Sequence, residues 1–223
     1  MRFSKSLLLS AAILVLPFVG QAASVKSDPT LTLADLTFSD FSCAVTHEGA
    51  AGPSNCGKID VHTITNPATG IQFASGFIAA SAGNNTAFDD ATINYHVTSL
   101  AGINNVGLDF NGTFYGWAIS SVTETIKDAS NNIVGFAQVT CGPTDMGGCI
   151  RSTSIALNGL YNDLYITKDI NVSAFLGVSQ ISYINQTFDP TPTPEPASFA
   201  MLGVGLIGAA GLLRRRAKAS AKA

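Results

Sequence analysis

Hydrophobic and polar residues alternate along much of the chain between residues 23 and 189. In the stretch DATINYHVTS, Ile93, Tyr95 and Val97 fall on one face of an extended strand. The opposite face carries the polar side chains of Thr92, Asn94, His96 and Thr98. A hydrophobic period of two predicts a strand with one buried face and one solvated face.

Similar segments recur between polar turns, and together they predict an all-β fold. Residues 120–141 predict a hairpin, because two alternating runs flank a turn-forming cluster at 128–132. The other strand-like segments are 31–41, 58–65, 71–80, 105–110, 114–121, 154–157, 163–169 and 180–188. A short helix at 31–38 is the alternative for the first of them. Strands at this spacing predict a single antiparallel β-sandwich over residues 23–189, with jelly-roll-like connections.

The N-terminal end, residues 1–22, has the three parts of a secretory signal peptide. Arg2 and Lys5 precede an apolar run at 7–19, and small residues follow, so we expect cleavage after Ala22. The apolar run is too short to span about 30 Å of hydrocarbon as a helix. This argues against the alternative of a retained membrane anchor.

The C-terminal end has a longer apolar run than the N-terminal end, and different residues flank it. Residues 190–196 contain four prolines and predict an extended linker. Residues 197–213 carry no charge and predict a transmembrane helix of about 25 Å, near the lower limit for spanning. The basic tail 214–223 is expected to stay in the cytoplasm, which places residues 23–189 outside that membrane. A buried core helix at 197–213 is the alternative.

The order of parts in this C-terminal segment resembles the PEP-CTERM sorting domain of exported bacterial proteins. Pro194, Glu195 and Pro196 form the motif, an apolar segment follows, and the basic cluster of Arg214, Arg215 and Arg216 comes last. The resemblance implies a Gram-negative host and processing by an exosortase, a membrane-embedded cysteine transpeptidase that removes the hydrophobic tail. These residues would be recognised by that enzyme. The final segment AKASAKA is longer than the family pattern.

The resemblance also implies a location and a class of ectodomain. It predicts export across the inner membrane, transient anchoring there by the C-terminal helix, and then display at the cell surface or release. The segments LTLADLTFSDFSC, DATINYHVT and LYITKDI are similar to a group of PEP-CTERM ectodomains of unknown activity.

The net charge argues against some classes of partner, and the cysteine content predicts disulfide bonds. Residues 23–189 contain five basic and fourteen acidic residues, a net charge of −9, which argues against nucleic acid as a partner. The four cysteines of an exported protein predict disulfides, with three possible connectivities. We favour Cys43–Cys56 and Cys141–Cys149, because each pair brackets a segment rich in Gly and Pro. The spacing of neither pair is that of zinc ligands.

Candidate reactive residues are few. His47 and Glu48 begin like a zinc-protease motif, but Ala51 stands where its second histidine is required, so we expect a loop. His62 and His96 lie on the polar sides of predicted strands, with nothing nearby to complete a triad or a metal site.

The best candidate for cation binding is a weak one. Asp89 and Asp90 could contribute to a calcium site, although the loop does not match the EF-hand pattern and a solvated turn is the simpler interpretation. We therefore predict no metal and no cofactor.

Three functional hypotheses remain. The first is a non-enzymatic surface or extracellular-matrix protein sorted by its C-terminal tail. The second is a carbohydrate-binding module acting on exopolysaccharide, because Phe114, Tyr115 and Trp117 form an aromatic cluster that could stack on sugar rings if exposed. The third is a hydrolase with a pair of carboxylates, which requires two acidic side chains across an open cleft.

Overall fold

The computed structural model describes residues 22–66, 68–143 and 147–190. Almost all of them lie in strands, and the two short 3-10 segments are η1 and η2. The elements are β1 Ala23–Ser24, η1 Val25–Ser27, β2 Leu31–Leu33, β3 Leu36–Glu48, β4 Ala50–Gly52, η2 Cys56–Lys58, β5 Asp60–Ile64, β6 Gly70–Phe110, β7 Thr113–Asp128, β8 Ile133–Cys141, β9 Cys149–Ile150 and β10 Ser152–Pro190.

These strands form one antiparallel sheet built around two very long strands. The main path of the sheet runs β1-β5-β6-β10-β7-β8-β9, with β3 and β4 also paired to β6. Strands β6 and β10 have 41 and 39 residues, and they pair from Ser152 opposite Asp109 to Thr187 opposite Gly70. The sequence predicted several shorter strands here. The polar segments between them are extended and paired as well, with shifts of register at several points.

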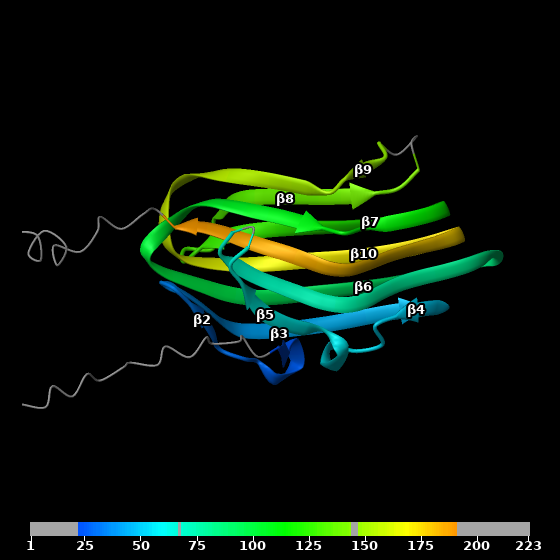
Figure 1. The fold of residues 1–223 in the computed structure, drawn as a ribbon, viewed down its shortest axis with the longest axis horizontal. Coiled ribbons are helices and arrows are strands. Elements are labelled where there is room, and N and C mark those ends of the chain that lie inside the picture. The colour runs from blue at the N-terminus through cyan, green and yellow to red at the C-terminus, as the bar shows by residue number, and fades with distance from the viewer. Residues whose placement is uncertain (1–21, 67, 144–146, 191–223) are drawn as a thin grey trace, which may run out of the picture.

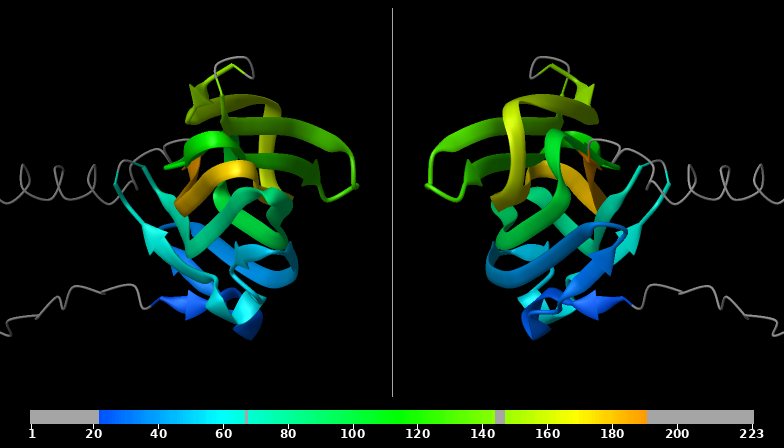
Figure 2. Two further views of the ribbon diagram at one scale, coloured as in Figure 1. Left: turned by 90° about the vertical axis from the view of Figure 1, so that its right-hand side faces the viewer. Right: turned by 90° about the vertical axis from the view of Figure 1, so that its left-hand side faces the viewer.

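The sheet curls until the end of β10 meets two parts of β6. Gln186 is opposite Ile71 on one side and opposite Leu108 on the other, so this part of β10 lies between the two ends of β6. Figure 1 shows the long strands side by side, and Figure 2 shows the curl along the long axis of the molecule. The all-β prediction is confirmed as a curled antiparallel sheet. The structure does not establish the finer prediction of a β-sandwich with jelly-roll connections.

The alternation of hydrophobic and polar residues along the strands determines which side chains form the core inside the curled sheet. Ile93, Tyr95 and Val97 are buried, as their shared face predicted. The Phe41 and Tyr95 rings stack at 5.4 Å between centroids. The alternative of a helix at 31–38 is wrong, because β2 and β3 form a hairpin there, with Leu33 opposite Leu36. The predicted hairpin over 120–141 is confirmed as β7 and β8.

Both predicted disulfides are present in the structure. Cys43 bonds to Cys56, which joins β3 to η2, and Cys141 bonds to Cys149, which joins β8 to β9. Each bridge closes a short segment of chain, which restricts the unfolded state and stabilises the fold.

Several predictions concern residues that the structure does not describe. The signal peptide up to residue 21, the linker and sorting motif from residue 191, the helix at 197–213 and the tail at 214–223 all lie outside the described residues. Within the described part of the chain, no helix has the length and apolar character needed to cross a membrane.

Candidate functional site

Three large aromatic side chains stand exposed on neighbouring strands. Tyr115 and Trp117 lie on β7 and Phe175 lies on β10, with 80%, 57% and 60% of their surfaces accessible. Soluble proteins seldom leave several aromatic side chains together in water unless they contact a partner. We call these three residues the aromatic platform.

Strand geometry explains why the platform faces outward. Trp117 is opposite Leu176 and Tyr115 is opposite Val178, so the two residues of β7 share the face that alternates with buried Ala118. The register shifts between Ala174 and Leu176, which leaves Phe175 as the extra residue of a β-bulge. Phe175 follows buried Ala174, so alternation places it on the exposed side, where it lines a hollow together with Trp117.

Two glycines let the strands approach closely next to the platform. Gly116 and Gly177 are opposite each other, with φ angles of 70° and 143°. A Cβ on Gly177 would lie 1.9 Å from the carbonyl oxygen of Tyr115, and a Cβ on Gly116 would lie 2.3 Å from that of Leu176. Both positions therefore require glycine.

Trp117 lies between two shallow hollows. One, of about 280 Å³, is lined by Trp117, Ile119 and Phe175, with Thr86 and Ser173 adding hydroxyl groups. The other, of about 560 Å³, is lined by Tyr115, Trp117, Leu176, Ser81 and the two glycines. The indole ring is thus shared by two open, mainly apolar depressions. Such a surface can take a flat ring on each side of one aromatic side chain.

The sequence identified part of this surface. It singled out Tyr115 and Trp117, but Phe114 is half-buried and packs against the core. Phe175 was missed: alternation with buried Val172 and Ala174 puts it on the exposed face, but its position beside Trp117 arises from the pairing of β10 with β7. No local motif in the sequence marks that pairing.

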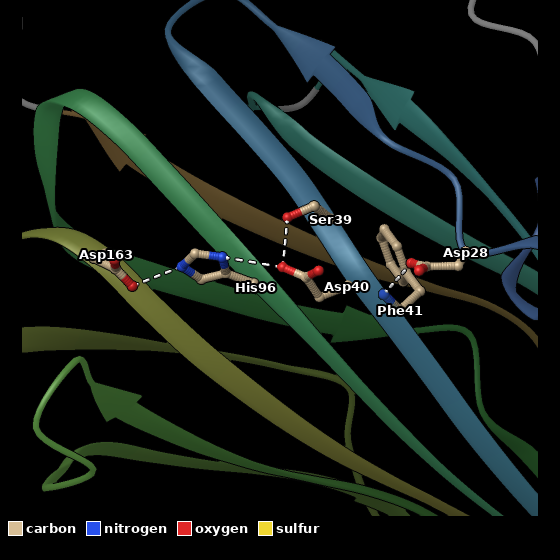
Figure 3. A network of polar contacts seen from close by, with 6 residues as sticks. All are labelled: Asp28, Ser39, Asp40, Phe41, His96 and Asp163. Atoms are coloured by element: carbon tan, nitrogen blue, oxygen red, sulfur yellow. Dashed lines mark hydrogen bonds and ion pairs between the residues drawn. The ribbon is translucent and has the colours of Figure 1, made fainter.

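A polar network lies elsewhere on the sheet, around His96 (Figure 3). Nε2 of His96 is 2.6 Å from Oδ1 of Asp163, and Nδ1 is 3.4 Å from Oδ2 of Asp40. Tyr165 stacks on the imidazole ring at 4.5 Å. The Ser39 hydroxyl donates a hydrogen bond to Asp40 and not to the histidine. These contacts link β3, β6 and β10 without the serine–histidine contact of a catalytic triad.

The two aspartates of the weak calcium candidate point in different directions. Asp89 is fully buried, and neither of its carboxylate oxygens has a hydrogen-bond partner among the described residues. Burial, reinforced by the charge of Asp90, raises the pKa of Asp89 to about 7. Consecutive strand residues face opposite sides of a sheet, so Asp90 lies on the other face. The structure therefore does not bring these two carboxylates together around one ion.

Asp90 instead acts on a carboxyl group of the neighbouring strand. The pKa of Asp169 on β10 is raised first by burial and then by Asp90. The lining of the two hollows beside Trp117 contains no carboxylate among the described residues.

The remaining histidines lie on β3 and β5. His47 and Glu48 lie at the exposed end of β3, where the sequence predicted a loop, and His62 is partly buried in β5. Across the described ranges, no group of three or more His, Cys, Asp or Glu side chains is arranged to hold a metal ion.

Comparisons with solved structures find distant likenesses. The chain is similar to the enzymatically active domain of tailspike protein 4 of bacteriophage CBA120, with 13% identity over 67% of this chain and 19% of that one, at a TM-score of 0.31. It is similar to TmCBM61, solved with β-1,4-galactotriose, with 11% identity over 66% of this chain and 88% of that one, at a TM-score of 0.33.

A third likeness is to accessory secretory proteins 1, 2 and 3 of Streptococcus pneumoniae, with 11% identity over 64% of this chain and 94% of that one, at a TM-score of 0.33. These TM-scores lie below 0.5, so no functional conclusion about this chain rests on them. The chain spans about a fifth of the tailspike structure. Comparison with curated protein sequences finds no match.

One sequence-family model does match, and it covers the C-terminal segment that the sequence singled out. The match spans residues 192–216, which include Pro194, Glu195 and Pro196 and end at the arginine cluster. This motif indicates export, sorting to the cell surface and processing by an exosortase. The chain therefore carries a PEP-CTERM protein-sorting motif at residues 192–216.

Proposed function

We propose that the protein is a non-enzymatic component of the cell surface or extracellular matrix that binds exopolysaccharide. The observation that carries the proposal is the aromatic platform, in which Trp117 stands exposed between two hollows. The sorting motif supports a location where such polymers are found. Two proposed partners follow: the exosortase, which acts on the tail, and the exopolysaccharide, which contacts the platform.

Stacking explains how the platform would hold a sugar. The apolar face of a pyranose ring can lie flat against an aromatic side chain, and burying both faces releases water. Tyr115 and Phe175 flank Trp117 on either side, one beside each hollow. A polymer lying across the platform would thus place successive rings on neighbouring aromatic side chains, while the Thr86 and Ser173 side chains lie beside one of them.

The negative charge of the protein indicates which class of polysaccharide it would bind. Residues 23–189 carry a net charge of −9, and basic residues are absent from the described lining of both hollows. A strongly anionic polymer would be repelled at low salt. The surface therefore favours neutral polysaccharides or those with few acidic groups.

The test compares two exposed aromatic side chains on the same sheet. Trp117→Ala is expected to weaken binding to a neutral polysaccharide about tenfold, corresponding to roughly 1–2 kcal/mol for one lost stacking contact. Phe136→Ala is the matched control, because Phe136 is equally exposed on β8. Its strand partner Thr125 lies about 26 Å along β7 from Trp117, at ~3.3 Å per residue.

Binding would be measured with the exported protein by affinity electrophoresis through gels containing the polysaccharide, and by calorimetry with its oligosaccharides. Equal binding by the wild type and Trp117→Ala would overturn the proposed surface. Retention by acidic polymers alone would contradict the charge argument. Release of new reducing ends during the assay would contradict the non-enzymatic assignment.

A further inference from the structure

Three buried polar side chains meet inside the curl of the sheet. Lys168 in the middle of β10, Glu124 on β7 and Gln186 near the end of β10 are all fully buried. Lys168 and Glu124 are opposite each other in the register of their strands. Gln186 is brought to them because the end of β10 lies between the two ends of β6. The curl therefore joins two distant parts of one strand through the core.

The distances place the lysine amine against both partners. Nζ of Lys168 is 2.5 Å from Oε2 of Glu124 and 2.6 Å from Oε1 of Gln186. The amide nitrogen Nε2 of Gln186 donates a hydrogen bond to the carbonyl oxygen of Gly107, at 3.0 Å. The side-chain amide is thus held in one orientation, with its carbonyl directed at the amine.

The surroundings of the Lys168 amine act on its charge in opposite directions. Burial lowers the pKa of Lys168, although the nearby carboxylate of Glu124 opposes that shift. Nζ also lies over the face of the Phe73 ring, 6.0 Å from its centroid, and such a contact favours the charged form. Within the described residues, Oε1 of Glu124 and the hydroxyl of Tyr95 have no hydrogen-bond partner. A buried ion pair with unsatisfied atoms is costly, so neutralising the group would relieve the core.

We propose that Lys168 and Gln186 join in an intramolecular isopeptide bond. The parts required for the reaction are a buried amine, an oriented amide carbonyl and a carboxylate that touches the amine. Glu124 would accept a proton from Lys168 and return one to the departing nitrogen, as a general acid–base group.

The reaction balances without any other reagent. Glu124 first takes a proton from the ammonium group, and the neutral Nζ attacks Cδ of Gln186. The new C–N bond forms while the bond from Cδ to Nε2 breaks. Nε2 leaves as ammonia after receiving a proton through Glu124, which ends protonated. The products are a secondary amide, a neutral carboxylic acid and one molecule of ammonia.

The position of the bond would matter for a protein attached by its C-terminus. Gln186 lies near the end of β10, shortly before the segment with the sorting motif. A force applied at the C-terminal end would pass from Gln186 through the covalent link to Lys168. Residues 169–185 would then bear no load and would not be pulled out of the sheet.

Mass spectrometry of the exported protein tests the bond directly. After reduction, denaturation and cleavage following aromatic residues, peptides 166–175 and 184–188 should appear as one branched species. Its mass should be lower than the sum of the two peptides by one ammonia, and fragmentation should place the branch at Lys168 and Gln186. Two separate peptides of unaltered mass would overturn the proposal. A link from Lys168 to Glu124 with loss of water would overturn it as well.

Variants test the role of Glu124. Glu124→Gln keeps the size of the side chain and both reacting residues but removes the base, so it should yield two separate peptides. Glu48→Gln, which removes an exposed carboxylate on β3, should leave the branched peptide intact. A full yield of branched peptide in Glu124→Gln would contradict the proposed role of that carboxylate. The wild-type spectrum decides the bond itself, whether or not the variant folds.

Discussion

Asp89 is a single carboxyl group whose burial should be visible in the stability of the whole protein. The unfolded chain ionises this group near its ordinary pKa of 3.8, whereas the folded protein holds it protonated up to about pH 7. The folded state therefore binds an extra proton between these values. Its contribution to the free energy of unfolding is largest below about pH 4 and falls as the pH rises towards 7.

Asp89→Asn should remove this dependence. The variant is expected to gain stability over the wild type as the pH rises from 4 to 7, by roughly 1–3 kcal/mol at pH 8, because the wild type must then bury a charge. Urea unfolding at several pH values measures the difference. Asp60→Asn, at an exposed site on β5, is the control and should show no such trend. A constant offset between Asp89→Asn and the wild type would contradict the interpretation.

At the scale of the strand, the aromatic platform depends on how β7 and β10 pair. Gly116 and Gly177 allow their backbones to approach, and Phe175 lies at the bulge beside them. A side chain at either glycine would push the strands apart and move the residues that flank Trp117. The geometry of the platform is therefore a property of the pair of strands.

Gly177→Ala should destabilise the protein and disturb the platform. Its Cβ would overlap the carbonyl oxygen of Tyr115, and its φ of 143° disfavours any side chain, so we expect a loss of about 2–4 kcal/mol. Gly76→Ala on β6 is the control, because a Cβ there meets no atom within 4 Å. Thermal unfolding should separate the two variants. Equal melting temperatures would show that the strands can adjust at little cost.

At the scale of the whole molecule, the curled sheet and the C-terminal sorting motif have separate tasks. Residues 23–189 carry the surface that we propose binds polysaccharide, and residues 192–216 carry the sorting motif. An exosortase must reach Pro194, Glu195 and Pro196 in an accessible segment. The prolines around them favour an extended backbone, which suits a peptide entering an active site.

Processing should appear in the mass of the exported protein. In a host with an exosortase we expect the mature chain to lack the hydrophobic segment 197–213, because that enzyme removes the tail. Glu195→Ala should retain it, whereas Thr191→Ala, which lies outside the matched motif, should be processed normally. A wild-type chain that remains intact through Ala223 in such a host would contradict processing and leave a simple anchored protein.

Part of this protein follows from local sequence alone. Alternation over residues 92–98 determined which side chains are buried, because a strand exposes its two faces in turn. The cysteines pair with their sequence neighbours, since short segments bring them together at low entropic cost. The sorting motif is read from consecutive residues, so Pro194, Glu195 and Pro196 could be recognised without a structure.

Tertiary structure decided the rest, because alternation shows which face a residue occupies but not which strand lies beside it. Phe175 lies beside Trp117 because this part of β10 pairs with β7. Lys168, Glu124 and Gln186 meet because the sheet curls and brings the end of β10 back over its middle. Contacts between residues far apart in the chain depend on loop closure and register across the whole sheet. No local pattern of side chains encodes them.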